Sequence, residues 1–213
     1  MVILTIIFEI LFIINFPLYW AITLKVKQVK IKKYYTKFFA ILWTIFIIFI
    51  LLLTSNIIQF IYKENLSYFQ DFWAWFLILG IIFIIAGFKI TSIARKLSKE
   101  KVSKPKDSKL TKYGIYKIIR HPNYLSWFLI FIGFSFIFDS FLTIVFVPIF
   151  IILLESHAIL EEKYILIPFY GNEYLDYKKK TPFRLVPRPY SYVFIILAVV
   201  IVYIGFYNFI LKN

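Results

Sequence analysis

Long apolar runs alternate with short polar connections over the whole chain. Four of these runs reach the roughly 20 residues that an α-helix needs to cross a bilayer, at residues 2–24, 38–62, 72–94 and 192–211. A further run, between Tyr124 and Glu155, is long enough for two crossings and has its polar break at Asp139 and Ser140. The pattern predicts an all-α fold: a polytopic integral membrane helix bundle of about six membrane segments, including a short helical hairpin.

Basic residues gather in alternate connections of this bundle. Six lysines fill the first connection, eleven basic residues lie from Lys89 to Arg120, and six lie from Lys163 to Arg188. Positively charged loops stay in the cytoplasm, so we expect the first, third and fifth connections there and both termini outside. In a soluble protein the net charge of +14 would suggest nucleic acid. Its distribution favours contacts with anionic membrane lipids instead, and we expect no nucleic-acid partner.

Missing residue types and motifs exclude several kinds of chemistry. The chain has no cysteine, which excludes disulfide bonds, thiolate metal ligands and a cysteine nucleophile. It contains no phosphate-binding glycine loop and no serine-hydrolase elbow. His121 and His157 are not spaced as zinc ligands, so we expect no metal site. Without repeats or linkers, the sequence predicts a single integral membrane domain at 1–213, with scaffold spans in 1–95, a core that carries the chemistry in 110–190 and an extra span in 191–211.

Two polar segments interrupt the apolar pattern, and both lie at the predicted cytoplasmic face. The first segment contains Tyr116, Arg120, His121, Pro122 and Tyr124, and the second contains Glu161, Glu162, Tyr174 and Tyr177. Ionisable residues are costly next to a bilayer and are kept there mainly for function. We therefore interpret the two segments as the halves of one site.

Turn-forming residues predict where these segments lie on helices. Pro122 suits the first turn of a helix, where its missing N–H is not needed, so the two residues before it should lie just outside a helix N-terminus. The second helix of the hairpin should run out into the cytoplasm, and Pro168 and Gly171 should end it. Residues 172–180 then predict a short amphipathic helix with Tyr174 and Tyr177 on one side.

The two segments together offer a cation, an imidazole, aromatic rings and paired acids. Such a set suits a ligand that carries both charges and an aromatic base: the acids would hold ammonium or hydroxyl groups, Arg120 a carboxylate, and the rings a base or a sulfonium. Taken singly, Arg120 and the tyrosines would be ordinary interfacial anchors, and Glu161 and Glu162 an ordinary solvated helix face. Only their combination indicates a binding site.

The first segment resembles the signature of the isoprenylcysteine carboxyl methyltransferase family in the pattern Gly114-x-Tyr116-x-x-x-Arg120-His121-Pro122-x-Tyr124-x-x-Trp127. The second segment is similar to that family's C-terminal motif at Glu161, Glu162, Leu166, Phe169, Gly171, Tyr174, Leu175, Tyr177, Lys178, Lys179 and Pro182. The resemblance covers residues 110–187. A similar pattern occurs in a wider superfamily of membrane methyltransferases that includes phospholipid methyltransferases.

This resemblance implies an enzyme that uses S-adenosylmethionine as methyl donor without a Rossmann domain. The implied cofactor site lies at the cytosolic boundary and is formed by the nine side chains named above, with Arg120 and Glu162 as catalytic residues. The implied acceptor is prenylated or otherwise lipid-tailed, most directly an isoprenylcysteine that is methylated on its carboxyl group. The implied location is multi-pass, with the active site facing the cytoplasm, in the plasma membrane of a prokaryote or the endoplasmic reticulum of a eukaryote.

The chain departs from the family pattern in three places. Ala158 stands about where the family often has an arginine, so recognition of a carboxylate would fall to His157 or Arg120. Ser126 replaces a common glycine before the signature tryptophan. The span at 192–211 extends beyond the point where many relatives end.

Two other functions remain open on the sequence. One is N-methylation of a phospholipid or another small amine, for which a base would be needed and His121, His157 or Glu161 would be the candidates. The other belongs to a different class, a non-catalytic lipid-binding membrane protein that retains the fold, because a fold does not guarantee an activity. No sequence feature indicates the oligomeric state.

Overall fold

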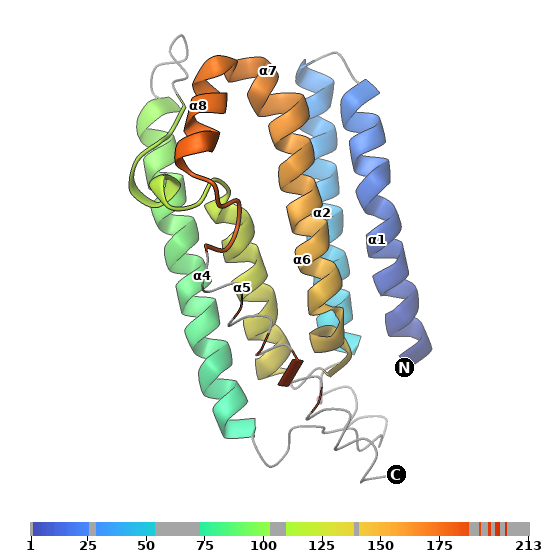
Figure 1. Cartoon of the computed structure of the whole chain (residues 1–213). Coiled ribbons are helices and arrows are strands. Elements are labelled where there is room, and N and C mark those ends of the chain that lie inside the picture. The colour runs from blue at the N-terminus through green and yellow to red at the C-terminus, as the bar shows by residue number, and fades with distance from the viewer. Residues whose placement is uncertain are drawn as a thin grey trace.

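The computed structural model describes residues 2–25, 29–53, 73–102, 110–138 and 141–187, and five further positions near the C-terminus. Within these parts the chain is all-α and contains no strand, as the hydrophobic pattern predicts. The elements in chain order are α1 (Val2–Lys25), α2 (Val29–Leu53), α4 (Trp73–Val102), the 3₁₀ turn η2 (Gly114–Lys117), α5 (Pro122–Ile137), α6 (Phe141–Glu161), the π turn η3 (Glu162–Leu166), α7 (Ile167–Tyr170) and α8 (Asn172–Lys180) (Figure 1).

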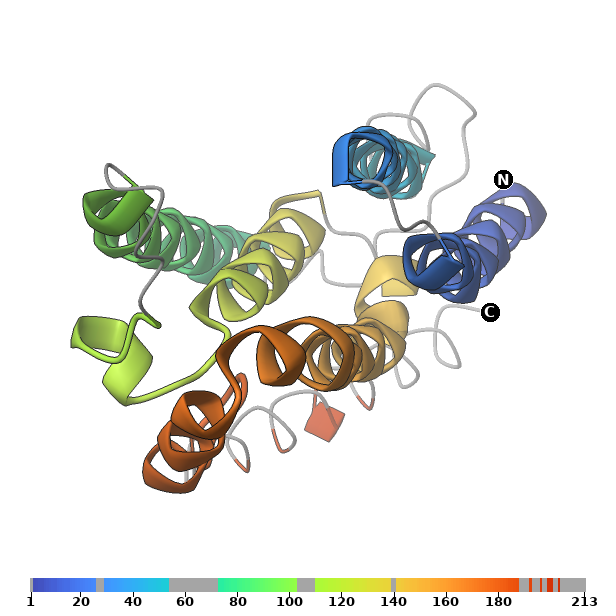
Figure 2. The same ribbon diagram turned by 90° about the horizontal axis from the view of Figure 1, so that it is seen from above.

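The long helices form an elongated bundle with α5 and α6 at its centre (Figure 2). Helix α4 lies alongside α5, α1 lies against α2, and contacts from α1 to α6 and from α2 to α5 join the two halves. A phenylalanine-rich core fills the space between them, in which the ring of Phe150 on α6 contacts Phe12 of α1 and Phe131 of α5. Packed aromatic rings of this kind hold neighbouring helices in fixed positions.

Glycines allow α4 and α5 to approach each other closely. A Cβ atom on Gly133 would lie 2.7 Å from the carbonyl oxygen of Gly80, and one on Gly87 would lie 2.9 Å from that of Ser126. Both distances are too short for ordinary contact, so larger side chains would push the helices apart. Thr91 and Ser126 hydrogen bond across the same interface, with 2.6 Å between their hydroxyl oxygens. The serine that departs from the family pattern therefore joins the two helices.

Among the described residues, two helices are long and apolar enough to cross a membrane, at Ile6–Leu24 in α1 and Ala74–Leu97 in α4. Large apolar side chains also remain exposed around the bundle, with Ile14, Ile41, Ile85 and Ile152 as examples from four different helices. Soluble proteins rarely expose apolar surface so widely, whereas lipid tails are a suitable solvent for it.

The predicted spans correspond to the helices with some differences. The predicted hairpin is present as α5 followed by α6, which contact each other, while its tip at 139–140 lies outside the described residues. Helix α2 begins earlier than the predicted span at 38–62, and residues 54–62 lie outside the described part. Most of the predicted span at 192–211 lies outside it too. The described residues thus agree with a helical bundle, and the total of six spans stays a prediction.

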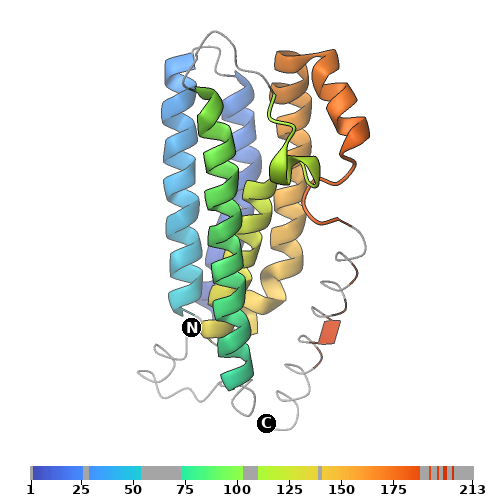
Figure 3. The same cartoon turned by 90° about the vertical axis from the view of Figure 1, so that its left-hand side faces the viewer.

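Short helices cover one end of the bundle. Helix α6 continues through η3 into α7, and the chain then turns at Gly171, whose φ of 57° is a backbone angle that glycine adopts without strain. This is the predicted helix end. The amphipathic helix that follows is α8, and Tyr174 and Tyr177 are buried on one of its sides, as predicted. Figure 3 shows η2 beside α8, so the two polar segments meet at this end.

Candidate active site

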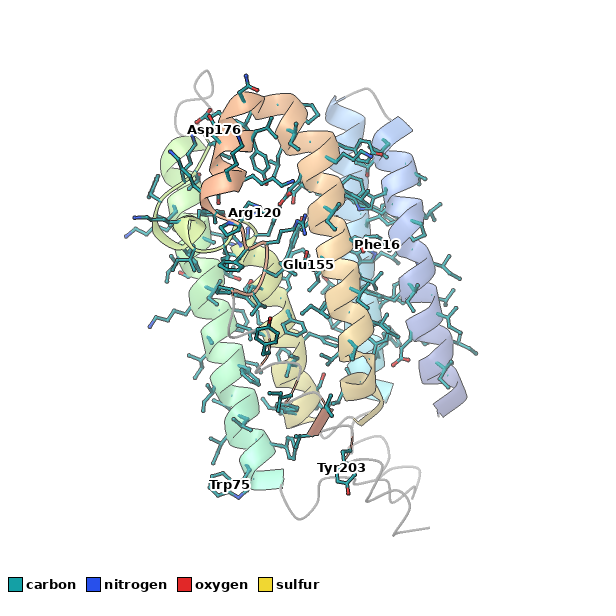
Figure 4. The ribbon with its side chains drawn as sticks, in the orientation of Figure 1. Phe16, Trp75, Arg120, Glu155, Asp176 and Tyr203 are labelled. Atoms are coloured by element: carbon teal, nitrogen blue, oxygen red, sulfur yellow. The ribbon has the colours of Figure 1, made fainter. Side chains whose placement is uncertain are left out.

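Backbone hydrogen bonds join the first polar segment to the end of the second. The amide nitrogens of Arg120 and His121 donate to the carbonyl oxygens of Phe183 and Arg184, at 3.0 and 2.9 Å. His121 directly precedes α5, and Pro122 occupies the first turn of that helix, as predicted. Two stretches that are distant in the sequence are therefore held together below α8, where Figure 4 shows Arg120.

Arg120 and Glu162 form a buried ion pair. Nε of Arg120 donates to Oε1 of Glu162 at 2.8 Å, and Nη1 of Arg120 donates to the carbonyl oxygen of Thr181. Burial alone would raise the pKa of Glu162, but its hydrogen bonds with His121 and Arg120 outweigh burial and lower that pKa to about 2. Glu162 is therefore ionised at neutral pH, and Arg120 is fixed at both ends of its guanidinium group.

His121 lies between the two acids. Its Nδ1 is 3.3 Å from Oε2 of Glu161, and its Nε2 is 3.1 Å from Oε1 of Glu162. Because both ring nitrogens face carboxylate oxygens, the doubly protonated imidazolium satisfies both contacts. Burial lowers the pKa of His121, but the hydrogen bonds with Glu161 and Glu162 outweigh burial, and the pKa is raised above its ordinary value. The surroundings therefore favour a positively charged His121.

Tyr124 completes the environment of Glu161. Its hydroxyl donates to Oε2 of Glu161 at 2.7 Å, and its ring stacks on His121 with 5.3 Å between the ring centroids. Burial raises the pKa of Glu161, but hydrogen bonds from His121 and Tyr124 outweigh it and the pKa is lowered. The π turn η3 begins directly after Glu161, and such local widenings of a helix are frequent at functional sites.

Helix α8 contributes two buried tyrosines. The hydroxyl of Tyr177 donates to the carbonyl oxygen of Tyr116 at 2.6 Å and so joins α8 to η2. The hydroxyl of Tyr174 is buried near the carboxylate of Glu162 and makes no hydrogen bond of ordinary geometry among the described residues. Burial is the largest cause that raises the pKa of both phenols, so both hydroxyls stay protonated at neutral pH. Tyr174 can therefore donate a hydrogen bond to a bound molecule.

These side chains surround a cavity of about 280 Å³, called the polar cavity below. Eight of the nine side chains predicted to contact a ligand line it: Tyr116, Arg120, His121, Pro122, Tyr124, Glu161, Tyr174 and Tyr177. The ninth, Glu162, lies behind the cavity wall, where it holds two of the lining residues. The structure thus brings both polar segments to one space and separates the roles of the two adjacent acids.

Sequence reasoning missed several residues of this region. Five further side chains line the polar cavity: Leu110, Thr111, Asn123, Leu166 and Tyr170. Two more cations support Glu162, since Arg184 Nε and Lys178 Nζ lie 3.5 and 3.6 Å from its carboxylate oxygens. Arg184 follows Pro182, the last residue of the second motif, by two positions, and this proximity is the signal from which it could have been found.

A second cavity, of about 440 Å³, lies between α1, α2, α5 and α6 and is called the apolar cavity below. Aromatic and aliphatic side chains form most of its wall, including Phe16, which Figure 4 shows between α1 and α6, and the signature residue Trp127. His157 also lines this cavity, and its ring lies 5.1 Å from that of Tyr124, which lines the polar cavity. The two cavities are therefore neighbours on either side of the contact between His157 and Tyr124.

The fold and the site together define a class of protein: a helix bundle with an apolar exterior, a polar cavity with an acidic wall at one end, and an apolar cavity beside it. Comparison with known proteins gives a family match for part of the chain. Residues 73–168 match the model of the isoprenylcysteine carboxyl methyltransferase family. Together with the two long apolar helices, this match indicates a membrane protein.

Curated relatives that match the chain bear the name protein-S-isoprenylcysteine O-methyltransferase. The one from Xenopus laevis is 30% identical over 114 residues, which cover 51% of this chain and 40% of the relative. The one from Saccharomyces cerevisiae is 34% identical over 113 residues, 48% of this chain and 46% of the relative. The chain thus spans less than half the length of these relatives. No solved structure matches the chain.

Proposed function

We propose that the chain is an S-adenosylmethionine-dependent methyltransferase that acts on a lipid-tailed acceptor, most directly on the carboxyl group of an isoprenylcysteine. The observation that carries this proposal is the polar cavity, where two distant segments supply an acid, cations and tyrosines to one space that neighbours an apolar cavity. The names of the curated relatives and the family match of residues 73–168 support the same activity.

The side chains of the polar cavity fit S-adenosylmethionine. Glu161 offers an ionised carboxylate for an ammonium or hydroxyl group, and the Tyr174 hydroxyl is a buried donor that makes no hydrogen bond of ordinary geometry in the described part of the chain. Tyr116 and Tyr124 offer ring surfaces that suit a positive charge or an aromatic base. When bound, this cofactor supplies a methyl group on a positively charged sulfur, open to attack by a nucleophile.

Arg120 and Glu162 keep different roles in this proposal. Arg120 lines the polar cavity and is the proposed catalytic residue that contacts the bound molecules, while its contacts with Glu162 and Thr181 hold it in place. Glu162 lies behind the wall and acts as a positioning residue for Arg120 and His121. An ion pair that is already formed needs no rearrangement when the ligands bind, which favours catalysis.

The apolar cavity is the proposed binding place of the acceptor's lipid tail. Its volume of about 440 Å³ and its aromatic wall suit an isoprenoid chain, and it neighbours the polar cavity where the acceptor's head group has to arrive. A carboxylate acceptor is ionised at neutral pH and requires no general base. The chain's own contribution is to align the head group at Tyr124 and to exclude water from it.

We further propose that the bundle crosses the membrane several times, with the polar cavity at the cytoplasmic face. The basic side chains at that end support this orientation, because cytoplasmic segments of membrane proteins are rich in lysine and arginine. Lys178, Lys179 and Lys180 form the last turn of α8, and they would contact anionic lipid headgroups.

The first experiment is S-adenosylmethionine binding to the detergent-purified protein, without acceptor. We expect micromolar affinity in the wild type and its loss in the Arg120→Ala, His121→Ala double variant. A matched control is Lys112→Ala, Lys179→Ala, which removes two positive charges from exposed positions at the same end. Absence of binding by a folded, monodisperse wild type would overturn the proposal and would favour the non-catalytic lipid-binding function.

The second experiment identifies the chemistry of the acceptor. Protein supplied with radiolabelled methyl donor and a prenylcysteine should form a product that loses its label in mild alkali, because carboxyl methyl esters hydrolyse there. Label that resists alkali and appears with a phospholipid or another amine would show N-methylation instead. The same preparation of the protein can be tested with both kinds of acceptor, and the Arg120→Ala, His121→Ala variant gives the background level of labelling.

A further inference from the structure

His157 is fixed by a hydrogen bond from a distant helix. Nε1 of Trp20 on α1 donates to Nδ1 of His157 on α6 at 2.9 Å. Since Nδ1 accepts this bond, the neutral ring carries its proton on Nε2. The Trp20 bond occupies Nδ1 and leaves the N–H of Nε2 to be donated to another group. The structure therefore presents His157 as a donor whose direction and tautomer are set by Trp20.

The surroundings of His157 are aromatic. The rings of Phe16, Tyr19, Trp20 and Trp43 all lie within 6 Å of the His157 ring by their centroids, and the ring of Tyr124 lies 5.1 Å from it. These contacts leave the imidazole little freedom to turn, while His157 still lines the apolar cavity. A polar residue that is held so firmly at the edge of an apolar cavity is suited to recognise one polar group of an otherwise apolar ligand.

Trp43 adds a second N–H group at this end of the apolar cavity. Its ring is 5.6 Å from that of His157, and its Nε1 is buried without a hydrogen-bond partner in the described part of the chain. A buried donor without a partner favours a hydrogen-bond acceptor or an anion nearby and disfavours an ammonium group. The nearest acid of the polar segments, Glu161, is already paired with His121 and Tyr124.

From these contacts we propose that His157 is a specificity-determining residue: its Nε2–H, held by Trp20, hydrogen bonds to an oxygen atom of the acceptor's head group while the tail occupies the apolar cavity. Trp43 strengthens the preference for an oxygen-bearing, anionic head over an ammonium head. This inference rests on the proposed function for the position of the acceptor. Arg120 lines the polar cavity and already donates to Glu162 and Thr181, whereas His157 lines the apolar cavity in which the tail is placed.

The test measures binding without the methyl donor, so it does not depend on turnover. Two probes share one farnesyl tail: N-acetyl-S-farnesylcysteine carries a carboxylate, and S-farnesylcysteamine carries an ammonium group. We expect the wild type to bind the carboxylate probe about tenfold or more tightly than the ammonium probe, the usual scale of a hydrogen bond to a charged group. His157→Phe should abolish this preference, and His157→Gln, which keeps an N–H donor, should restore part of it.

Trp20→Phe tests the positioning separately. It removes the N–H that sets the tautomer together with part of the buried ring, and we expect the preference for the carboxylate probe to fall several-fold while the affinity for the ammonium probe changes much less. The matched control is Trp75→Phe on α4, an exposed tryptophan at the other end of the bundle in Figure 4, which should change nothing. S-adenosylmethionine binding should survive in all these variants.

The outcomes separate this inference from the proposed function. A wild type that binds both probes equally, or a His157→Phe variant that keeps the preference, would overturn the role of His157 whether or not the protein is a methyltransferase. A preference that depends on His157 in a protein that binds no S-adenosylmethionine would support the inference and overturn the proposed function. Failure of both probes to bind the folded wild type would overturn the inference.

Discussion

Arg120 and Glu162 are 42 residues apart in the chain, yet Nε and Oε1 of their side chains lie 2.8 Å apart and both side chains are almost fully buried. Removing one partner of a buried ion pair leaves a charge without compensation, which is far more costly than the loss of an exposed pair. The pair therefore links the stability of this end of the bundle to the shape of the polar cavity.

Glu162→Gln should lower the free energy of unfolding by about 3 kcal/mol, because Arg120 and His121 keep their charges and lose the carboxylate between them. It should also weaken S-adenosylmethionine binding about tenfold or more in the fraction that remains folded, since both residues line the polar cavity. Thermal unfolding in detergent and equilibrium binding measure the two effects.

The matched control for this change is Glu173→Gln. Glu173 pairs with Lys112 at the same distance of 2.8 Å, but both side chains are more than two-fifths exposed, and such pairs contribute about 0–1 kcal/mol. Equal behaviour of the two variants would contradict the structural importance of Glu162. Normal cofactor binding by Glu162→Gln would show that Glu162 does not position the residues that bind the cofactor.

The low pKa of Glu162 predicts an acid-dependent loss of stability. A carboxyl group with a pKa of about 2 in the folded protein and about 4.5 when unfolded stabilises the fold above pH 4.5 and loses this contribution as the pH falls towards 2. The difference in stability between wild type and Glu162→Gln should therefore shrink as the pH falls below 4.5. A difference that does not change with pH in that range would show that the contribution of Glu162 is not ionic.

His121 should titrate above its ordinary pKa of 6.5, because it contacts two carboxylates. With a pKa raised in the folded state, its contribution to stability is fully present below pH 6.5 and is lost as the pH rises through the folded pKa. The chain has only two histidines, so NMR of labelled imidazoles in wild type and His157→Gln assigns both signals. A His121 signal that titrates below 6.5 would contradict the imidazolium between Glu161 and Glu162.

Removing the hydroxyl groups of the two tyrosines of α8 should have different effects on stability and on cofactor affinity. Tyr177→Phe removes a hydrogen bond to the carbonyl oxygen of Tyr116 and should lower the free energy of unfolding by about 1 kcal/mol. Tyr174→Phe removes a hydroxyl that makes no hydrogen bond of ordinary geometry among the described residues, so stability should stay the same while cofactor affinity falls. Thermal unfolding and binding on both variants provide the comparison, and a stability loss in Tyr174→Phe without any binding defect would refute this assignment.

Gly133→Ala should destabilise the contact between α4 and α5 by about 1–3 kcal/mol, because the added methyl group would lie 2.7 Å from the backbone oxygen of Gly80. The change lies on the helix that begins at Pro122, so the polar cavity should also be distorted and cofactor affinity reduced. Ile85→Ala, an exposed position on α4, serves as the control and should cost far less. Thermal unfolding of the two variants checks the difference.

Much of the helical fold could be predicted from local sequence patterns. The start of α5 at Pro122, the turn at Gly171 and the amphipathic character of α8 agree with the structure, since each follows from the backbone angles or the periodicity of a few neighbouring residues. The grouping of the two polar segments at one end could also be predicted, because charge placement and helix parity bring them to the same face.

Other features depended on contacts that no local pattern contains. Glu161 and Glu162 are adjacent and alike in sequence, but the π turn and the packing around Arg120 leave Glu161 on the cavity wall and Glu162 behind it. Trp20 and His157 meet only because α1 packs against α6. The sequence by itself determined the helices, their ends and the chemical inventory of the site, because these depend on nearby residues. Only the tertiary structure decided which of those groups pair and which stay free to bind, because partners that are distant in the chain are selected by the packing of whole helices.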